Sequence, residues 1–138
     1  MKKVLVLCTG NSCRSQIAAG YFNHFAPQLD VYSAGIETHG LNPRAVQTML
    51  EDSIDISAYH SNHIEEYKDI HFDLVFTVCD HAKEQCPIFP NTRKQIHFSF
   101  NDPAKASGTE VEIMQVFRRV RNEIKSFVHQ VILTDFKA

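Results

Sequence analysis

The 138-residue sequence has no strong charge of either sign and no long apolar run. Its 14 lysines and arginines are nearly balanced by 16 aspartates and glutamates, which leaves a formal net charge of −2. This balance excludes a basic field that would recruit nucleic acid or an anionic membrane. No apolar segment reaches the ~18 residues needed to span a bilayer, and the N-terminus enters a strand directly rather than a signal-peptide core. We therefore expect a cytoplasmic protein that binds neither nucleic acid nor membrane.

Internal repeats, low-complexity segments and linkers are also missing, which favours a single domain over residues 1–138. At 43% hydrophobic content, the chain can bury one sizeable core. The basic residues are scattered, and Arg118, Arg119 and Arg121 are expected on a solvated face of a helix. Nothing in the sequence specifies an oligomer, so a monomer is the default expectation.

The four cysteines fall into two pairs along the chain, Cys8 with Cys13 and Cys79 with Cys86. In a cytoplasmic protein they do not indicate a structural disulfide framework. Their spacing also differs from that of the short cysteine pairs of zinc sites. The eight histidines are dispersed, and the nearest two, His60 and His63, are expected as exposed residues of a loop or helix. We therefore predict no metal site.

Hydrophobic periodicity predicts strands and helices that alternate along the chain. The expected strands are 4–7, 29–33, 72–78 and 95–98. The expected helices are 15–25, 43–51, a single turn at 65–68 and a long helix after Thr109, where Glu112 completes a capping box. This alternation indicates an α/β fold, a three-layer sandwich whose four-stranded parallel sheet has helices on both faces.

The most informative segment joins the first strand to the first helix and reads Leu7-Cys8-Thr9-Gly10-Asn11-Ser12-Cys13-Arg14-Ser15. Cys8 ends a buried strand, at the edge where open parallel sheets place their ligands. Gly10 and Asn11 tolerate the positive φ that would turn backbone N–H groups inward. The helix N-terminus attracts anions, and Arg14 adds a planar fork that fits a tetrahedral oxyanion. The segment predicts a cradle for phosphate or a similar oxyanion, with the Cys8 thiol at its base.

The same surroundings are expected to activate Cys8 as a nucleophile. A free thiol has a pKa of about 8.5, and a helix N-terminus with neighbouring cations lowers the pKa of such thiols to roughly 3.5–7.5. A helix dipole contributes only about 0.3–1 kcal/mol, so the loop N–H donors, Arg14 and the Ser15 hydroxyl would have to supply the rest. The alternative is a buried structural cysteine, which the spacing of Gly10, Asn11, Arg14 and Ser15 disfavours.

The second cysteine pair follows the strand expected at 72–78. By the rule used for Cys8, Cys79 belongs at the same sheet edge and is a candidate to approach Cys8. In a helical segment Cys79 and Cys86 would lie roughly 10 Å apart, whereas a disulfide needs Cα atoms within about 7 Å. A bond between them therefore requires the segment to bend or unwind. Either both are packing residues, or the three thiols form a relay in which each disulfide is attacked by the next thiolate, and we favour the relay.

Together these motifs make the chain resemble the thioredoxin-coupled arsenate reductases that share the low molecular weight tyrosine phosphatase fold. The matching segments are Cys8 to Gln16, Tyr32 to Pro43, Cys79, Cys86-Pro87 and Asp102-Pro103. They extend over nearly the whole chain and are much more specific than the C-x₅-R loop alone. The related phosphatases typically carry proline where this chain has Gln16, and they lack the Cys79/Cys86 pair.

The resemblance implies an oxyanion site with assigned roles. The Cys8 thiolate would attack arsenate, Asp102 would protonate the departing oxygen, and Ser15 would hydrogen-bond the thiolate. Asn11 would hold the curled geometry of the loop. The residues that would bind substrate are Thr9, Gly10, Asn11, Ser12, Cys13 and Arg14, of which Cys13 has no further chemical task.

The resemblance also implies the route of the electrons. Cys79 would attack the sulfur of the Cys8–arsenic adduct and release arsenite, and Cys86 would then attack Cys79. Reduced thioredoxin, with no bound cofactor, would reduce the Cys79–Cys86 disulfide. The sequence leaves glutaredoxin or another thiol open as the reductant, although a dithiol donor suits a protein disulfide.

The chain departs from the family pattern in two places. Several reductases of this kind bind a monovalent cation beneath the loop through carboxylates, but the matching positions here hold Ala19 and Asn62. We therefore predict weak or absent potassium dependence. The tryptophan that usually precedes the Asp-Pro motif is also absent, because the segment before Asp102 reads His97-Phe98-Ser99-Phe100-Asn101.

Two other functions stay open at this point. A small phosphatase acting on phosphotyrosine would need Cys8, Arg14 and Asp102, with water rather than Cys79 resolving the adduct. A non-catalytic oxyanion-binding or redox-sensing module would use Cys79 and Cys86 to switch a partner surface. Replacement of Cys79 separates these functions, since reductase turnover should vanish and phosphatase turnover should survive.

Overall fold

Four strands form one sheet in the computed structural model, which describes residues 1–80 and 89–136. In chain order they are β1 Lys3–Cys8, β2 Asp30–Gly35, β3 Leu74–Thr77 and β4 Gln95–His97. Their order in the sheet is β2-β1-β3-β4, and every pairing is parallel. The predicted four-stranded parallel sheet is confirmed, with β1 between β2 and β3.

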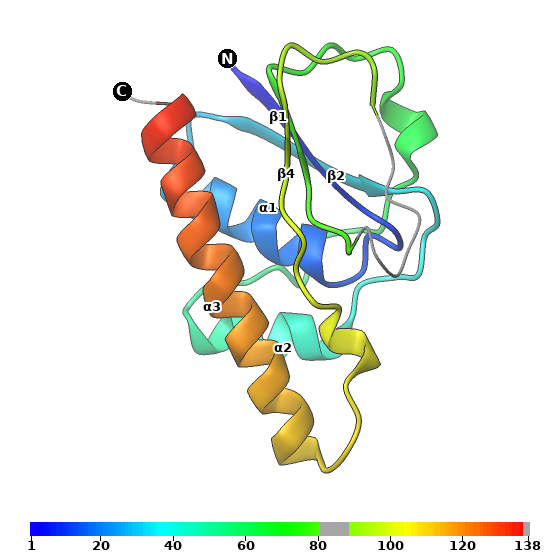
Figure 1. The fold of residues 1–138 in the computed structure, drawn as a ribbon, viewed down its shortest axis with the longest axis vertical. Coiled ribbons are helices and arrows are strands. Elements are labelled where there is room, and N and C mark those ends of the chain that lie inside the picture. Colours follow the sequence, from blue (N-terminus) through cyan, green and yellow to red (C-terminus); the bar gives the residue numbers. More distant parts are fainter. Residues whose placement is uncertain (81–88, 137–138) are drawn as a thin grey trace.

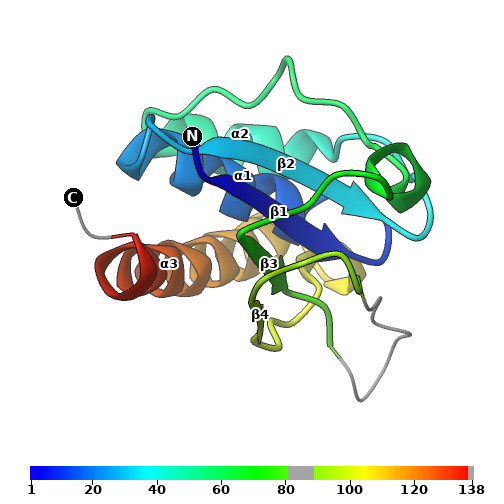
Figure 2. The ribbon, with the colours of Figure 1, turned by 90° about the horizontal axis from the view of Figure 1, so that it is seen from above.

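Three α-helices and two 3₁₀ helices accompany the sheet in the described residues: α1 Arg14–Phe25, α2 Pro43–Glu51, η1 Ile64–Tyr67, η2 Pro103–Lys105 and α3 Glu110–Asp135. Helices α1 and α3 pack on each other on the same face of the sheet, and α2 packs against both (Figures 1 and 2). Helix η1 lies on the other face. The expectation of helices on both faces is confirmed, although in the described part of the chain the second face carries a 3₁₀ helix rather than an α-helix.

Alternate side chains of β1 supply both halves of the core. Val4 and Val6 belong to the cluster that includes the apolar residues of α1 and α3. Leu5 and Leu7 belong to a smaller cluster with Phe72 and the apolar residues of η1. All four β1 side chains are completely buried. A central parallel strand covered on both faces is apolar throughout, which is why this segment reads as a continuous hydrophobic run.

The helix boundaries follow local capping. The Asn42 side chain accepts hydrogen bonds from two backbone N–H groups in the first turn of α2, and Pro43 takes the first helical position. Thr109 and Glu112 form the expected capping box at the start of α3. Strand β3 is shorter than expected, because Phe72 makes only an isolated bridge with Thr92 before the strand begins. Within the described residues, none of the helices combines the length and apolarity required to cross a membrane.

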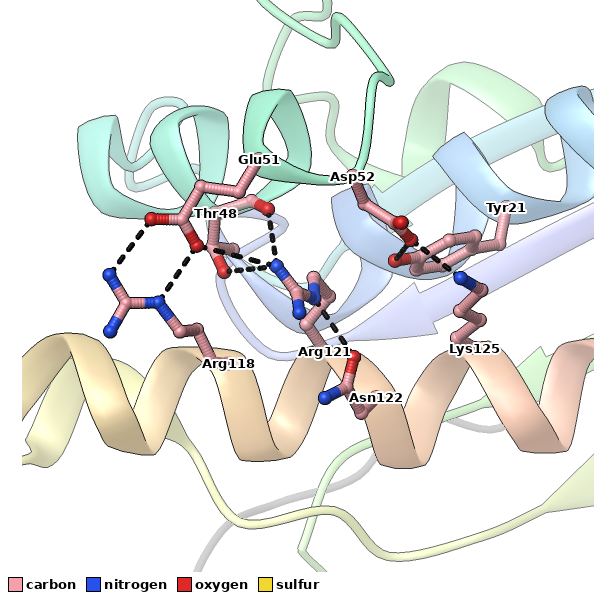
Figure 3. A network of polar contacts seen from close by, with 8 residues as sticks. All are labelled: Tyr21, Thr48, Glu51, Asp52, Arg118, Arg121, Asn122 and Lys125. Atoms are coloured by element: carbon pink, nitrogen blue, oxygen red, sulfur yellow. Dashed lines mark hydrogen bonds and ion pairs between the residues drawn. The ribbon is translucent and has the colours of Figure 1, made fainter.

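A polar network fastens α3 to α2 and α1 (Figure 3). The guanidinium of Arg118 donates two hydrogen bonds of 2.8 Å to the carboxylate of Glu51. The carboxylate of Asp52 accepts from Lys125 at 2.8 Å and from the Tyr21 hydroxyl at 2.6 Å. These contacts fix the long helix beside the N-terminal half of the chain.

The same network corrects one expectation. The cluster of arginines on α3 does not lie on one solvated face, because Arg121 donates to the Thr48 carbonyl oxygen at 2.9 Å and only 13% of its side chain is exposed. Arg119 is the member that is exposed as expected. The helical spacing sends these neighbouring residues to different sides of α3.

Candidate active site

Cys8 is the last residue of β1 and lies at the base of the loop that leads into α1. Cys8 is buried, with only 2% of the residue exposed. The Sγ of Cys8 lies 3.0 Å from the Oγ of Ser15 in the first turn of α1. Ser15 Oγ also accepts a hydrogen bond of 2.7 Å from Asn11 Nδ2. Because Asn11 donates to Ser15 Oγ, the hydroxyl hydrogen stays available to the sulfur, where it would stabilise a thiolate.

Asn11 holds the loop in its curled form. Its φ is +49°, the left-handed conformation that the sequence predicts for this position. Its Oδ1 accepts from the backbone N–H of Asn62 at 2.7 Å, and its carbonyl oxygen accepts from Ser61 Oγ at 3.0 Å. Gln16 donates to the same carbonyl oxygen at 3.0 Å. The loop is therefore tied to the distant segment 60–62 as well as to its own helix.

Gly10 plays a different part from the one that the sequence suggests. The glycines with positive φ in the described chain are Gly40 and Gly108, so the expectation of positive φ at Gly10 is wrong. A Cβ at Gly10 would instead overlap the imidazole ring of His39. At Gly35 a Cβ would come within 2.5 Å of the Thr9 carbonyl oxygen. Both glycines permit close contact between the loop and the segment that follows β2.

Arg14 and Asp102 meet across the loop although 88 positions separate them in the sequence. Arg14 is buried, and its Nη1 donates to the carbonyl oxygen of Phe100 at 3.2 Å. Its Nη2 lies 3.7 Å from Oδ2 of Asp102. The other oxygen of Asp102 accepts from the backbone N–H of Ala104 at 3.0 Å, which caps η2. The structure therefore places the carboxyl group of Asp102, the expected acid, beside the guanidinium of Arg14, which is expected to bind the oxyanion.

These groups surround one cavity of about 260 Å³. It is lined by Cys8, Thr9, Gly10, Ser12, Cys13, Arg14, Glu37, His39, Asp102, Ala104 and Lys105. Three of these residues, Glu37, His39 and Lys105, have no role predicted from the sequence. For Glu37 and His39 the available signal is position, since 37–39 closely follow the carboxyl end of β2. The backbone N–H groups of Glu37 and His39 donate to the carbonyl oxygens of Thr9 and Gly10 at 2.9 and 3.0 Å.

Cys13 lies on the wall of this cavity as the N-cap of α1. Burial, together with the nearby charge of Asp102, raises the pKa of the Cys13 thiol to about 12. Cys13 therefore stays protonated at neutral pH, when it is a poor nucleophile. This agrees with the absence of a chemical task for this cysteine in the expected mechanism.

Cys79 lies close to the same sheet edge. Thr77, the last residue of β3, is the register partner of Leu7, and the Val78 N–H donates to the Leu7 carbonyl oxygen at 3.0 Å. Cys79 is completely buried and shares a cluster with Cys8 and Cys13. It is disulfide-bonded, whereas Cys8 and Cys13 carry free thiols. The predicted third relay thiol, Cys86, lies outside the described residues.

The region beneath the loop contains a polar cavity of about 180 Å³. Ala19 and Asn62 are among the residues that line it, together with Gln16, Ser33 and His60, and none of its described lining residues carries a carboxylate. Within the described chain no group of three histidine, cysteine or acidic side chains could hold a metal ion. His63, one of the two histidines closest in sequence, caps η1 by accepting from the backbone N–H of Glu65.

The chain is similar to known proteins over nearly its whole length. The family model of low molecular weight phosphotyrosine protein phosphatases matches residues 3–137. An arsenate reductase from Halalkalibacterium halodurans is 51% identical over 124 residues, and one from Bacillus subtilis is 49% identical over 124 residues. Each match covers 89% of this chain and 89% of the relative.

Solved structures of an arsenate reductase and of a tyrosine phosphatase are also similar to the chain. An arsenate reductase in the phosphate binding state has a TM-score of 0.81 at 33% identity, with coverage of 97% of this chain and 98% of that chain. A tyrosine phosphatase from Erwinia amylovora shares the fold, with a TM-score of 0.76 at 16% identity and coverage of 99% and 94%. The chain belongs to the low molecular weight phosphotyrosine protein phosphatase family, within the group formed by its arsenate reductases.

Proposed function

We propose that this chain reduces arsenate to arsenite through a relay of Cys8, Cys79 and Cys86. The observation that carries the proposal is the pairing of Cys8 Sγ with Ser15 Oγ at 3.0 Å in a cavity lined by Arg14 and Asp102. A cavity of about 260 Å³ suits a small tetrahedral oxyanion. Arsenate reductases that are 51% and 49% identical to the chain support the same reaction.

The first step forms a bond between sulfur and arsenic. Arsenate binds in the loop, with its charge opposed by the Arg14 guanidinium and the N–H groups at the start of α1. The Cys8 thiolate attacks the arsenic atom, and one arsenic–oxygen bond breaks. Asp102 donates a proton to the departing oxygen, which leaves as water. Arsenic is still in its +5 state in this adduct, so no electrons have yet been transferred to it.

The second step supplies the electrons. The Cys79 thiolate attacks Cys8 Sγ, the sulfur–arsenic bond breaks, and its electron pair stays with arsenic, which leaves as arsenite. The two electrons come from the two sulfurs, which are now joined in a Cys8–Cys79 disulfide. Cys86 then attacks Cys79, which frees the Cys8 thiolate and moves the disulfide to Cys79 and Cys86. A disulfide-bonded Cys79 together with a free Cys8 thiol agrees with the last step of this reaction.

The cycle closes when a dithiol reduces the protein disulfide. We assign this task to reduced thioredoxin, which transfers two electrons and two protons by the same exchange chemistry. The enzyme would work as a monomer in the cytoplasm, where reductants of this kind keep thiols reduced. The bound groups it requires are the substrate oxyanion and, transiently, thioredoxin.

The test is arsenate-dependent NADPH consumption in the presence of thioredoxin and thioredoxin reductase. Steady turnover that stops in both Cys79→Ser and Cys86→Ser supports the relay. In the Cys86→Ser protein, a single turnover of arsenite with a trapped Cys8–Cys79 disulfide is expected. Turnover that persists in either variant, or that needs only a monothiol donor, would contradict the three-thiol scheme.

A phosphotyrosine phosphatase is the second candidate, because Cys8, Arg14 and Asp102 suffice for phosphoryl transfer and the family model carries that name. It predicts hydrolysis of an aryl phosphate that survives the Cys79→Ser change. A redox-sensing module, the third candidate, predicts neither activity. Comparison of arsenate reduction with aryl phosphate hydrolysis on one sample separates the three.

A further inference from the structure

A third cavity lies away from the anion loop (Cys8 to Ser15), between the segment after β4 and one side of α3. Its volume is about 710 Å³, more than twice the 260 Å³ of the cavity over Cys8. Pockets that hold small organic ligands have volumes of roughly 300–1,000 Å³. This cavity is therefore large enough for such a ligand, and the proposed reaction does not use it.

Three phenylalanine rings form the apolar wall of the cavity. The ring centroids of Phe98 and Phe127 are 4.4 Å apart, and those of Phe98 and Phe100 are 4.8 Å apart. Phe98 is 44% exposed although its ring packs at a tilt against two other rings. An exposed aromatic surface of this kind is a platform on which a planar ring can stack with favourable offset geometry.

Two charged side chains of α3 line the same cavity, Arg119 and Glu123. In the part of the chain that the structure describes, neither makes a hydrogen bond or an ion pair. This contrasts with Arg118 and Lys125 of the same helix, which are paired with carboxylates at the end of α2 (Figure 3). A free guanidinium offers a planar fork for a carboxylate or sulfonate, and a free carboxylate accepts an N–H donor.

The apolar wall is connected to the candidate active site through Phe100. The carbonyl oxygen of Phe100 accepts from Arg14 Nη1 at 3.2 Å, and Asp102 follows two residues later. The segment that forms this wall therefore also positions the oxyanion fork and the proposed acid. A ligand that stacks on Phe98 contacts the same segment that holds Arg14, which gives the two sites a direct physical connection.

We infer that the cavity between 98–101 and α3 is a regulatory site for a planar aromatic anion that also carries an N–H donor. The ring stacks on Phe98 and Phe127, the negative group pairs with Arg119, and the N–H donates to Glu123. Occupancy strengthens oxyanion binding in the loop over Cys8 through the contact between Phe100 and Arg14. The site itself is independent of the proposed reaction, whereas the coupling rests on the proposed anion loop.

The binding half is tested with 8-anilinonaphthalene-1-sulfonate, which combines an aromatic ring system, a sulfonate and an N–H group. Fluorescence titration of the folded protein should show one saturable site. The Arg119→Glu variant should bind the probe at least about tenfold more weakly, as expected for the loss of one charge-assisted pair and its replacement by repulsion. The matched control is Arg93→Glu, the same charge change at an exposed arginine remote from the cavity, which should leave the affinity unchanged. Equal affinities of the two variants would overturn the site.

The coupling half is tested by calorimetric titration with inorganic phosphate, with and without saturating probe. The dissociation constant for phosphate should fall by at least about fivefold, and phosphate should tighten probe binding by the same factor. Phosphate that displaces the probe would show that the sulfonate occupies the anion loop, and this would overturn the inference. An unchanged dissociation constant would overturn the coupling. Failure of the protein to bind phosphate at all would instead contradict the anion loop, and with it the coupling, while the probe affinities still decide the site.

Discussion

The Oγ of Ser15 stands between the sulfur of Cys8, at 3.0 Å, and the amide nitrogen of Asn11, at 2.7 Å. The amide nitrogen can only donate, so the hydroxyl hydrogen does not point to Asn11 and is available to the sulfur. Asn11 is in turn held by the backbone N–H of Asn62 at 2.7 Å. The Cys8 thiol is therefore connected by a chain of hydrogen bonds to Asn62, which lies 51 positions after Asn11 in the sequence.

Replacement of Ser15 by alanine should slow alkylation of Cys8 by iodoacetamide at neutral pH. The variant loses one hydrogen bond to a charged sulfur, worth about 1.5–3 kcal/mol, and the rate should therefore fall by a factor of about ten or more. The measurement is mass-spectrometric labelling of the peptide that contains Cys8. Ser107→Ala, at an exposed position that does not line the cavity over Cys8, should label at the rate of the unchanged protein. A Ser15→Ala protein that labels as fast as this control would contradict the role of the hydroxyl.

Replacement of Gly35 by alanine should abolish oxyanion binding. A Cβ there would come within 2.5 Å of the Thr9 carbonyl oxygen, so the anion loop must move away from β2. The free energy of unfolding should fall by about 1–3 kcal/mol, as for other overpacked sites.

Gly40→Ala provides a matched control for that change. Gly40 has a φ of +80° and open space around the position of a Cβ. Alanine there costs about 1–2 kcal/mol of stability through backbone strain alone. Urea unfolding should therefore give similar losses for the two variants, whereas calorimetry should show phosphate binding in Gly40→Ala only. Binding that is retained in both variants would contradict the steric argument.

The raised pKa of Cys13 predicts a loss of stability in alkaline solution. The folded protein holds the thiol proton up to a pH of about 12, whereas the unfolded chain releases it near the ordinary thiol value. Between these two values the unfolded state binds fewer protons, so the free energy of unfolding falls as pH rises. Below the ordinary thiol pKa the contribution is constant.

The variant Cys13→Ala should make this part of the profile flatter than in the unchanged protein. The measurement is urea unfolding at several pH values from neutral to moderately alkaline. Burial and the hydrogen bond to Asp52 also raise the pKa of Tyr21, and this contribution acts in the same direction in both proteins. Parallel profiles for the two proteins would show that Cys13 does not titrate differently on folding.

Potassium should have little effect on the KM for arsenate. The cavity beneath the loop is lined by Ala19 and Asn62, with no carboxylate among its described lining residues. Such a site offers a cation neutral oxygens but no charge. Steady-state assays in potassium chloride and in equimolar choline chloride should give the same KM. A large decrease in KM with potassium would refute the prediction, and the Ala19→Glu variant would then be expected to enlarge the effect.

The sequence was most informative where local chemistry decides the structure. The alternation of apolar strands with capped helices predicts the parallel sheet, and the positive φ of Asn11 follows from the tolerance of asparagine for that conformation. The sequence was misleading at Gly10, because the constraint there is the ring of His39, which belongs to another segment. Steric contact between distant segments leaves no mark in the local pattern.

The residues around Cys8 also divide into those that the sequence predicts and those that it does not. Cys8, Arg14 and Ser15 lie within one short segment, so their proximity can be anticipated. The contribution of Asn62 to the loop, and of the Phe100 carbonyl oxygen to Arg14, depends on packing across the sheet. The paired arginines of α3 were expected to be solvated, since a sequence shows the spacing of charges on one helix but not the carboxylates of another.

The two oxygens of Asp102 have different neighbours. Oδ1 accepts the N–H of Ala104 at 3.0 Å, whereas Oδ2 faces Arg14 at 3.7 Å. An oxygen that already accepts from a backbone amide is a poor place for a proton, so in the proposed reaction the acidic hydrogen belongs on Oδ2. In the proposed reaction the proton would therefore leave from the side of the carboxyl group that faces Arg14, and the hydrogen bond to Ala104 favours this orientation.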